Sequence, residues 1–213
     1  MSPQRDSRHD SAPPRLVLAT ANQHKLAELA RILAAAEIGV ALAGLGEFPG
    51  APDVAETGAT FAENALLKAR EMAEFTGLPA VADDSGLCAD ALNGMPGVLS
   101  ARWAGQHGDD KANLNLLLAQ IADVPPDRRS AHFAAVAALV LPSGAEHVTE
   151  GTVSGWLTDA PRGTNGFGYD PIFVPASSSL TTAQMSPEDK DAISHRGRAL
   201  RAMAPVIAAL LGN

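Results

Sequence analysis

The sequence LVLATANQHKLAELARIL, residues 16–33, passes from a short apolar run through a polar turn into leucines at helical spacing. This order predicts a strand, a tight turn and a helix, as in many α/β folds. Asn22 is the expected N-cap, so the first-turn amides and the positive end of the helix dipole would face the region beyond the strand. Such a helix start suits a phosphate group.

A second helix and a second strand are predicted next. Residues 60–63 (TFAE) match the capping-box pattern, and Asn64 and Lys68 lie four apart on one face of the helix that follows. Residues 79–83 indicate a short strand that ends in Asp83-Asp84-Ser85-Gly86. Ligands of open α/β sheets bind at the carboxyl ends of strands, so we expect a functional site there.

The C-terminal half begins with a predicted hairpin. Residues 131–141 and 146–157 are rich in β-branched and apolar residues, and the turn residues between them favour two paired strands that build a second lobe. Residues 163–170 are a glycine-dense loop. Residues 194–211 are the expected last helix, which Pro205 should kink or interrupt.

The length and composition indicate one globular domain. Of the 213 residues, we expect 1–14 to be a disordered N-terminal extension and 15–213 to form a single domain. No apolar run approaches the roughly 20 residues that span a bilayer, so a soluble protein without a membrane partner is expected. The single cysteine, Cys88, excludes an intramolecular disulfide and favours a reducing, cytoplasmic location.

The charge balance limits the partners of the protein. Sixteen basic against twenty-four acidic residues give a formal net charge of −8, which argues against a nucleic-acid-binding surface. A small anionic ligand remains compatible, because a cleft needs only a few focused cations and a divalent metal to bind it.

Carboxylates near the end of the second predicted strand suggest a metal site. Asp83 and Asp84 would point to opposite faces of a strand, and only a turn would let both approach one metal ion, so one should be the stronger ligand. Carboxylate oxygens suit Mg²⁺, although Asp-Ser-Gly is also common in exposed turns. Of the nearby acids, Glu56 is the preferred second ligand, because Glu63 is the reciprocal half of the capping box.

The cations and aromatic residues suggest a phosphorylated, planar ligand. Only four lysines occur, and Lys25, Lys68 and Lys190 together resemble a polyphosphate clamp, although each alone is more often a solvated surface residue. The aromatic residues of the 163–170 loop offer a stacking face or a hydrophobic anchor. His195 and Arg196, at the start of the last helix, can donate hydrogen bonds to a base carbonyl.

These motifs together resemble the inosine triphosphate pyrophosphatase family, in its bacterial dITP/XTP pyrophosphatase branch. The matching segments keep the order and spacing of the family from Leu16 to the C-terminus, and they are TANQHK (20–25), ETG (56–58), TFAENA (60–65), ADDSGL (82–87), PG (96–97), SAR (100–102), GFGYDP (166–171) and SHRG (194–197). The resemblance implies an elongated α/β fold with a mixed central sheet flanked by helices, two lobes around a nucleotide cleft, and a homodimer.

The resemblance also implies an activity and its residues. The expected reaction is Mg²⁺-dependent hydrolysis of deaminated purine nucleoside triphosphates (ITP, dITP, XTP, dXTP) to the monophosphate and pyrophosphate, which clears them from the nucleotide pool before incorporation into DNA or RNA. One or more Mg²⁺ ions would be bound by Glu56 and Asp84, and Asp84 would accept the proton of the attacking water. The implied substrate contacts are Thr20, Ala21, Asn22, Gln23, His24, Lys25, Ser85, Phe167, Gly168, Tyr169, Asp170, Lys190, His195 and Arg196.

Three other functions are alternatives to this one. A phosphohydrolase of the haloacid dehalogenase type needs an aspartate nucleophile in a spaced Asp-x-Asp motif, whereas Asp83 and Asp84 are contiguous. A Maf-type pyrophosphatase has a similar fold and acts on other nucleotides, but residues 194–196 favour the purine branch. A nucleotide sensor without catalysis is the alternative outside enzymes, and the presence of Lys25 and Asp84 argues against it. A serine or cysteine nucleophile is not supported, so water is the expected nucleophile.

Overall fold

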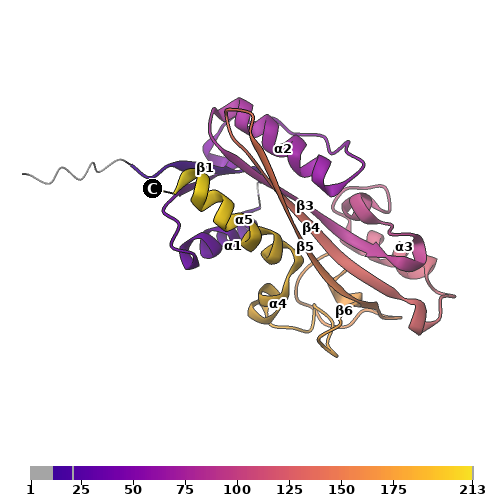
Figure 1. Ribbon diagram of the computed structural model, residues 1–213. Coiled ribbons are helices and arrows are strands. Elements are labelled where there is room, and N and C mark those ends of the chain that lie inside the picture. The colour runs from indigo at the N-terminus through magenta and orange to yellow at the C-terminus, as the bar shows by residue number, and fades with distance from the viewer. Residues whose placement is uncertain (1–11, 21, 213) are drawn as a thin grey trace, which may run out of the picture.

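One mixed six-stranded sheet organises the molecule (Figure 1). The computed structural model describes residues 12–212 except Ala21, and of His24 it describes the backbone alone. The strand order is β2-β1-β3-β4-β5-β6; the first three strands run parallel and the remaining pairs are antiparallel. The strands are β1 (Arg15–Leu18), β2 (Ala41–Gly44), β3 (Ala80–Ala89), β4 (Ser130–Val140), β5 (Glu146–Leu157) and β6 (Phe173–Pro175). The helices are α1 (Gln23–Ala35), α2 (Phe61–Thr76), α3 (Asp110–Gln120), α4 (Pro187–Ile193) and α5 (His195–Leu211), with a 3₁₀ helix η3 at Gly97–Arg102.

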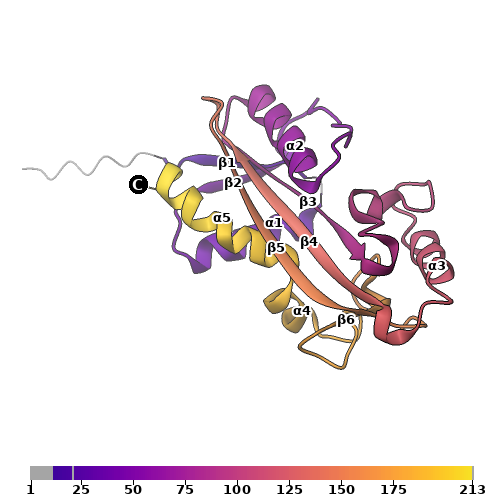
Figure 2. The ribbon, with the colours of Figure 1, turned by 45° about the vertical axis from the view of Figure 1, so that its right-hand side comes forward.

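The three longest strands give the molecule its elongated shape. β3, β4 and β5 contain 10, 11 and 12 residues and run together from one end of the molecule to the other (Figures 1 and 2). The expected α/β fold with an elongated mixed sheet is confirmed. The hairpin of β4 and β5 is, however, not a lobe of its own, because β4 pairs with β3 along its length as well as with β5. The two lobes are the two ends of one continuous sheet.

Helices cover both faces at one end of this sheet. α2 lies on one face, while α1 and α5 lie on the other (Figures 1 and 2). β1 shows why: Leu16 and Leu18 join the core beneath α1 and α5, whereas Val17 joins the core beneath α2, as alternation along a strand requires. A third core at the other end packs α3 against β3–β6. No helix in the described part of the chain is both long and apolar enough to cross a bilayer.

The elements differ from the sequence-based expectations at three places. The strand expected over residues 79–83 continues to Ala89, because its second half pairs residue by residue with β4. Pro205 does not interrupt the last helix, which runs through it to Leu211 with the proline exposed. The short helix α4 was not foreseen, although Ser186 caps it by accepting a hydrogen bond from the backbone N–H of Asp189.

Gly151 lets α5 lie directly on β5, which gives a test of the packing. A Cβ atom at Gly151 would lie 2.2 Å from the backbone oxygen of His195 and 2.6 Å from the backbone nitrogen of Ala199. Because neither backbone atom can rotate away, we expect Gly151→Ala to lower the free energy of unfolding by about 1–3 kcal/mol in urea denaturation. Gly39→Ala is the matched control, since nothing lies within 4 Å of its added Cβ. Equal stability of the two variants would contradict this packing.

Candidate active site

Strand β3 carries two buried carboxylates just beyond the end of β1. Leu18, the last residue of β1, pairs with Val81, so β1 stops two residues short of Asp83. Asp83 and Asp84 are 5% and 8% exposed. Because the strand continues without a turn, their side chains point to opposite faces of the sheet. Each face therefore receives one buried negative charge, and the two charges have different partners.

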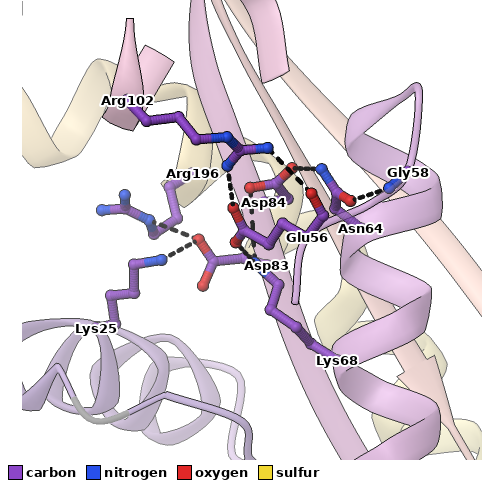
Figure 3. A network of polar contacts seen from close by, with 9 residues as sticks. All are labelled: Lys25, Glu56, Gly58, Asn64, Lys68, Asp83, Asp84, Arg102 and Arg196. Carbon is purple, nitrogen blue, oxygen red and sulfur yellow. Dashed lines mark hydrogen bonds and ion pairs between the residues drawn. The ribbon is translucent and has the colours of Figure 1, made fainter. Parts of the chain in front are cut away.

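On the face of α1 and α5, Asp83 is paired with two cations (Figure 3). Its Oδ2 atom accepts hydrogen bonds from Lys25 Nζ at 2.7 Å and from Arg196 Nε at 3.1 Å. Burial alone would raise the pKa of Asp83, but the charges of Lys25 and Arg196 outweigh it and hold the pKa far below its ordinary value. Asp83 is therefore ionised and fixes one cation from each of two helices.

On the face of α2, Asp84 lies among polar groups of that helix (Figure 3). Its Oδ2 accepts a hydrogen bond from Asn64 Nδ2 at 3.0 Å, and its Oδ1 lies 3.6 Å from Lys68 Nζ. Burial raises the pKa of Asp84, and the negative charge of Glu56 adds to this, while Lys68 and the hydrogen bonds of Asn64 lower it. The net shift is upward. Asp84 is thus a more basic carboxylate than an exposed aspartate.

Glu56 completes a cluster of two carboxylates around one lysine. Lys68 Nζ donates to Glu56 Oε1 at 2.8 Å, and Arg102 of η3 binds both the carboxylate and the backbone carbonyl of Glu56. Burial would raise the pKa of Glu56, but Lys68 and Arg102 lower it overall. The positive charges of Lys68 and Arg102 therefore balance the two negative charges of Glu56 and Asp84.

This donor set fits a hard divalent cation that shares its ligands with a substrate. Within the described residues, no three side chains of histidine, cysteine, aspartate or glutamate converge as a ready-made metal cage. Mg²⁺ is typically bound by one or two carboxylates and completes its shell with water and phosphate oxygens. Glu56 and Asp84 are two such carboxylates. Both lie close to the ammonium of Lys68, at 2.8 Å and 3.6 Å from its Nζ atom, and so they lie near each other.

A cleft of about 550 Å³ lies on the other face of β3, bordered by α1, α4 and α5, within the size range of small-ligand sites. Ten of the predicted substrate contacts line it: Asn22, Lys25, Ser85, Phe167, Gly168, Tyr169, Asp170, Lys190, His195 and Arg196. The cleft and the Glu56–Asp84 cluster therefore lie on opposite faces of β3. Only this strand separates them, because the neighbouring strand β1 has already ended.

The glycine-dense loop that forms one wall of the cleft is fixed by Asp170. This buried carboxylate accepts hydrogen bonds from the backbone N–H of Phe167, from Lys190 Nζ and from the hydroxyl of Thr182. Gly166 has a φ of +76° and a Cβ there would lie 2.1 Å from Asp170 Oδ2, so only glycine fits. Asp170 thus shapes the loop, and its oxygens are engaged by the protein itself.

The aromatic residues of this loop have different surroundings. The ring of Tyr169 is buried, and its hydroxyl donates to the backbone oxygen of Ser100 at 2.9 Å. Phe167 is 58% exposed, and Lys190 Nζ lies 5.0 Å from the centre of its ring. Phe167 is therefore the ring that is accessible for stacking, whereas Tyr169 anchors the loop.

His195 lies in the wall of the cleft against an aromatic ring. Its imidazole is stacked on Phe133, with ring centres 4.8 Å apart and planes within 9°. Burial, followed by the charges of Arg196 and Lys190, lowers the pKa of His195 to about 3. His195 is therefore neutral at physiological pH and offers one hydrogen-bond donor and one acceptor.

The other predicted residues that the structure describes do not line the cleft. Lys68, Glu56 and Asp84 form the cluster on the opposite face of β3, as described above. Thr20 accepts a hydrogen bond from the backbone N–H of Asn22 and so shapes the turn before α1, while Gln23 is exposed at the start of that helix. Ala21 and the side chain of His24 lie outside the described residues.

The structure adds residues that sequence reasoning missed. Asn64 orients Asp84, and its signals in the sequence are its spacing of four from Lys68 and its place in the TFAENA segment. Arg102 holds Glu56, and its signal is the SAR segment of residues 100–102, which lies in a stretch without a periodic pattern. Glu28 of α1 and Phe133 of β4 line the cleft, and each fits the ordinary pattern of its helix or strand. Their roles depend on neighbours far away in the sequence.

Comparisons with known proteins agree on one family. A family model described as the Ham1 family matches residues 16–206. A dITP/XTP pyrophosphatase of Streptomyces coelicolor is 61% identical over 198 residues, which cover 93% of this chain and 99% of that protein. A solved nucleoside-triphosphatase / dITP/XTP pyrophosphatase of Mycobacterium abscessus is 56% identical with a TM-score of 0.77, covering 90% of this chain and 99% of its own. A HAM1 protein of Coxiella burnetii is 42% identical with a TM-score of 0.85, covering 92% and 99%.

The buried, neutral state of His195 predicts a specific pH dependence. The pKa of His195 is lowered from 6.5 to about 3 in the folded protein. Between pH 6.5 and pH 3, this histidine therefore binds a proton in the unfolded chain but not in the folded one. The free energy of unfolding should therefore fall as pH falls below 6.5, by at most about 1.4 kcal/mol per pH unit from this residue.

Urea denaturation at pH 7 and pH 5 measures this contribution. We expect His195→Gln to lose less stability between the two pH values than the unsubstituted protein, whereas His107→Gln, at an exposed position, should behave like the unsubstituted protein. An NMR titration that shows the ring of His195 protonating near pH 6.5 would contradict the prediction.

Proposed function

The chain belongs to the Ham1 family, and we propose that, like the dITP/XTP pyrophosphatases it matches, it hydrolyses ITP, dITP, XTP and dXTP to the monophosphate and pyrophosphate. This activity would remove deaminated purine nucleotides before they enter DNA or RNA. The resemblance to the inosine triphosphate pyrophosphatase family is confirmed by these matches. The observation that carries the proposal is a cationic, aromatic-walled cleft that lies one strand's width from a pair of carboxylates.

The arrangement of charges suggests how the substrate lies. The phosphates would bind between Lys25 in the first turn of α1 and the cluster around Lys68, near the residues 20–25 turn, where the positive end of the helix dipole favours anions. The base would then reach the wall formed by His195 and Arg196, with Phe167 available to stack on it. Ser85, next to Asp84 on β3, lines the same cleft.

Glu56 and Asp84 are the residues proposed to bind Mg²⁺. The metal would supply charge that offsets the phosphates and orients them for in-line attack. Arg102 holds Glu56 in place for this purpose, and Asn64 does the same for Asp84. In the absence of ligand, Lys68 pairs with both carboxylates, and its flexible ammonium can turn to phosphate oxygens when the substrate binds.

Asp84 is the proposed proton acceptor. Its carboxylate lies at the cluster that would hold Mg²⁺, and the hydrogen bond from Asn64 fixes its orientation. As the water oxygen bonds to phosphorus, its proton passes to Asp84 and the bridging P–O bond between the α and β phosphates breaks. Pyrophosphate leaves with the electron pair of that bond, and the nucleoside monophosphate remains.

Discrimination between bases follows from hydrogen-bond direction. Hypoxanthine and xanthine present an acceptor oxygen at position 6, whereas adenine presents an amino donor. Arg196 carries only donors, so an adenine in this place would leave buried donors facing each other. We propose that Arg196, assisted by neutral His195, reads this oxygen.

The setting of the enzyme belongs to the same proposal. We expect a homodimer in the cytoplasm that binds neither nucleic acid nor membrane, with residues 15–213 as the catalytic domain and residues 1–14 as an extension. The formal charge of −8 supports the absence of a nucleic-acid surface.

A substrate panel tests the activity. Pyrophosphate release from ITP, XTP, GTP and ATP is measured with Mg²⁺ and with a chelator. We expect turnover of ITP and XTP well above that of GTP and ATP, and its loss when the metal is chelated. Turnover without preference would favour a different nucleotide pyrophosphatase, and the absence of any turnover would favour a nucleotide sensor.

The variant Asp84→Asn tests the proton acceptor. The asparagine keeps the shape and can still accept the hydrogen bond of Asn64, but it is no longer a base. We expect turnover of ITP to fall by about 10²–10⁴-fold. The circular dichroism spectrum should remain that of the folded protein. Asp127→Asn, at an exposed position, is the control and should keep full activity. Near-normal turnover in Asp84→Asn would overturn the proposed site.

A further inference from the structure

Asp83 holds two cations that belong to different parts of the cleft. Lys25 comes from the first turn of α1, and Arg196 comes from the first turn of α5. Both donate to the same oxygen, Asp83 Oδ2, whose side chain is 4% exposed. Two positive charges held on one buried oxygen repel each other, so a change at either cation alters the electrostatic environment of the other.

The two cations differ in how freely they can move. The ammonium of Lys25 sits on a flexible four-carbon stem and has three donors, so it can turn toward a phosphate. The guanidinium of Arg196 is a rigid planar fork, and its Nε bond to Asp83 fixes the direction of its remaining donors. Glu28 restrains the same guanidinium weakly, with its Oε2 3.8 Å from Arg196 Nη1. Asp83 is therefore the principal anchor of Arg196.

We propose that Asp83 is a positioning residue that couples phosphate binding at Lys25 to the reading of the base by Arg196. This inference rests on the proposed function, since it assigns Lys25 to phosphate and Arg196 to the base. When phosphate draws Lys25 away from Oδ2, Arg196 becomes the main partner of the carboxylate and its hydrogen bond tightens. The remaining guanidinium donors are then held toward the base, so base discrimination is strongest when the triphosphate is bound.

A purely structural role for Asp83 makes a different prediction. In that case, loss of the charge would loosen α1 and α5 and would lower the hydrolysis of every nucleotide by the same factor. Coupling instead predicts that the loss is specific to the group at position 6. ITP and GTP both carry an oxygen there, whereas ATP carries an amino group. The ratio of ITP to ATP should change, and the ratio of ITP to GTP should not.

The variant Asp83→Asn separates the two roles. We expect its preference for ITP over ATP, measured as the ratio of kcat/KM values, to fall by about 10- to 100-fold, which is the effect of losing one charge-assisted hydrogen bond. The preference for ITP over GTP should change by no more than about twofold, because both bases carry an oxygen at position 6. Asp159→Asn, which removes an exposed carboxylate 3.6 Å from Arg162, is the matched control and should change neither ratio. An unchanged ITP-to-ATP ratio in Asp83→Asn would overturn the coupling.

A measurement on the unsubstituted protein covers the case in which Asp83→Asn does not fold. The ¹⁵N–¹H signal of the Arg196 Nε group is assigned by its loss in Arg196→Lys and is followed while inorganic tripolyphosphate is added. We expect the signal to shift and its proton to exchange more slowly with water, although no base is present. A signal that tripolyphosphate leaves unmoved would overturn the coupling. Because this experiment needs no turnover, it remains decisive even if the protein fails to hydrolyse ITP.

Discussion

The structure depends on two adjacent aspartates, Asp83 and Asp84, because strand β3 continues through both of them without a turn. Alternation along β3 sends Asp83 to one face of the sheet and Asp84 to the other, and burial makes each charge costly unless a partner offsets it. Three cations and one amide, from helices α1, α2 and α5, supply those partners. One strand thereby divides the site into a cleft on one face and a carboxylate cluster on the other.

The opposite environments of the two aspartates explain their different chemistry. Asp83 is almost enclosed by Lys25 and Arg196, so its pKa is held low and it acts as a fixed counter-charge. For Asp84, burial and the negative charge of Glu56 raise the pKa more than Lys68, 3.6 Å away, lowers it. Two carboxylates that are adjacent in sequence therefore take separate roles because their surroundings differ.

Close approach of backbone elements gives the site its rigidity. α5 lies directly on β5 where Gly151 leaves room for the backbone of His195, and this contact places Arg196 beside β3. At the other wall, Gly166 makes room for the carboxylate of Asp170, which ties the loop to Lys190. Arg196 and Lys190 are therefore held in defined positions before any ligand arrives.

The sequence by itself determined the α/β class, the helix that begins after residue 22, the paired strands after residue 130, and the segments that belong to the site, because periodicity, capping and turn chemistry are local properties. It did not determine where β3 ends, since Asp83-Asp84-Ser85-Gly86 has the composition of a turn and becomes strand only through its pairing with β4. Only the tertiary structure decided which aspartate faces which cation, and it brought Arg102 to Glu56 and Arg196 to Asp83 across 46 and 113 positions of sequence. Those contacts depend on how the sheet and helices pack, and packing is a property of the whole chain rather than of any segment.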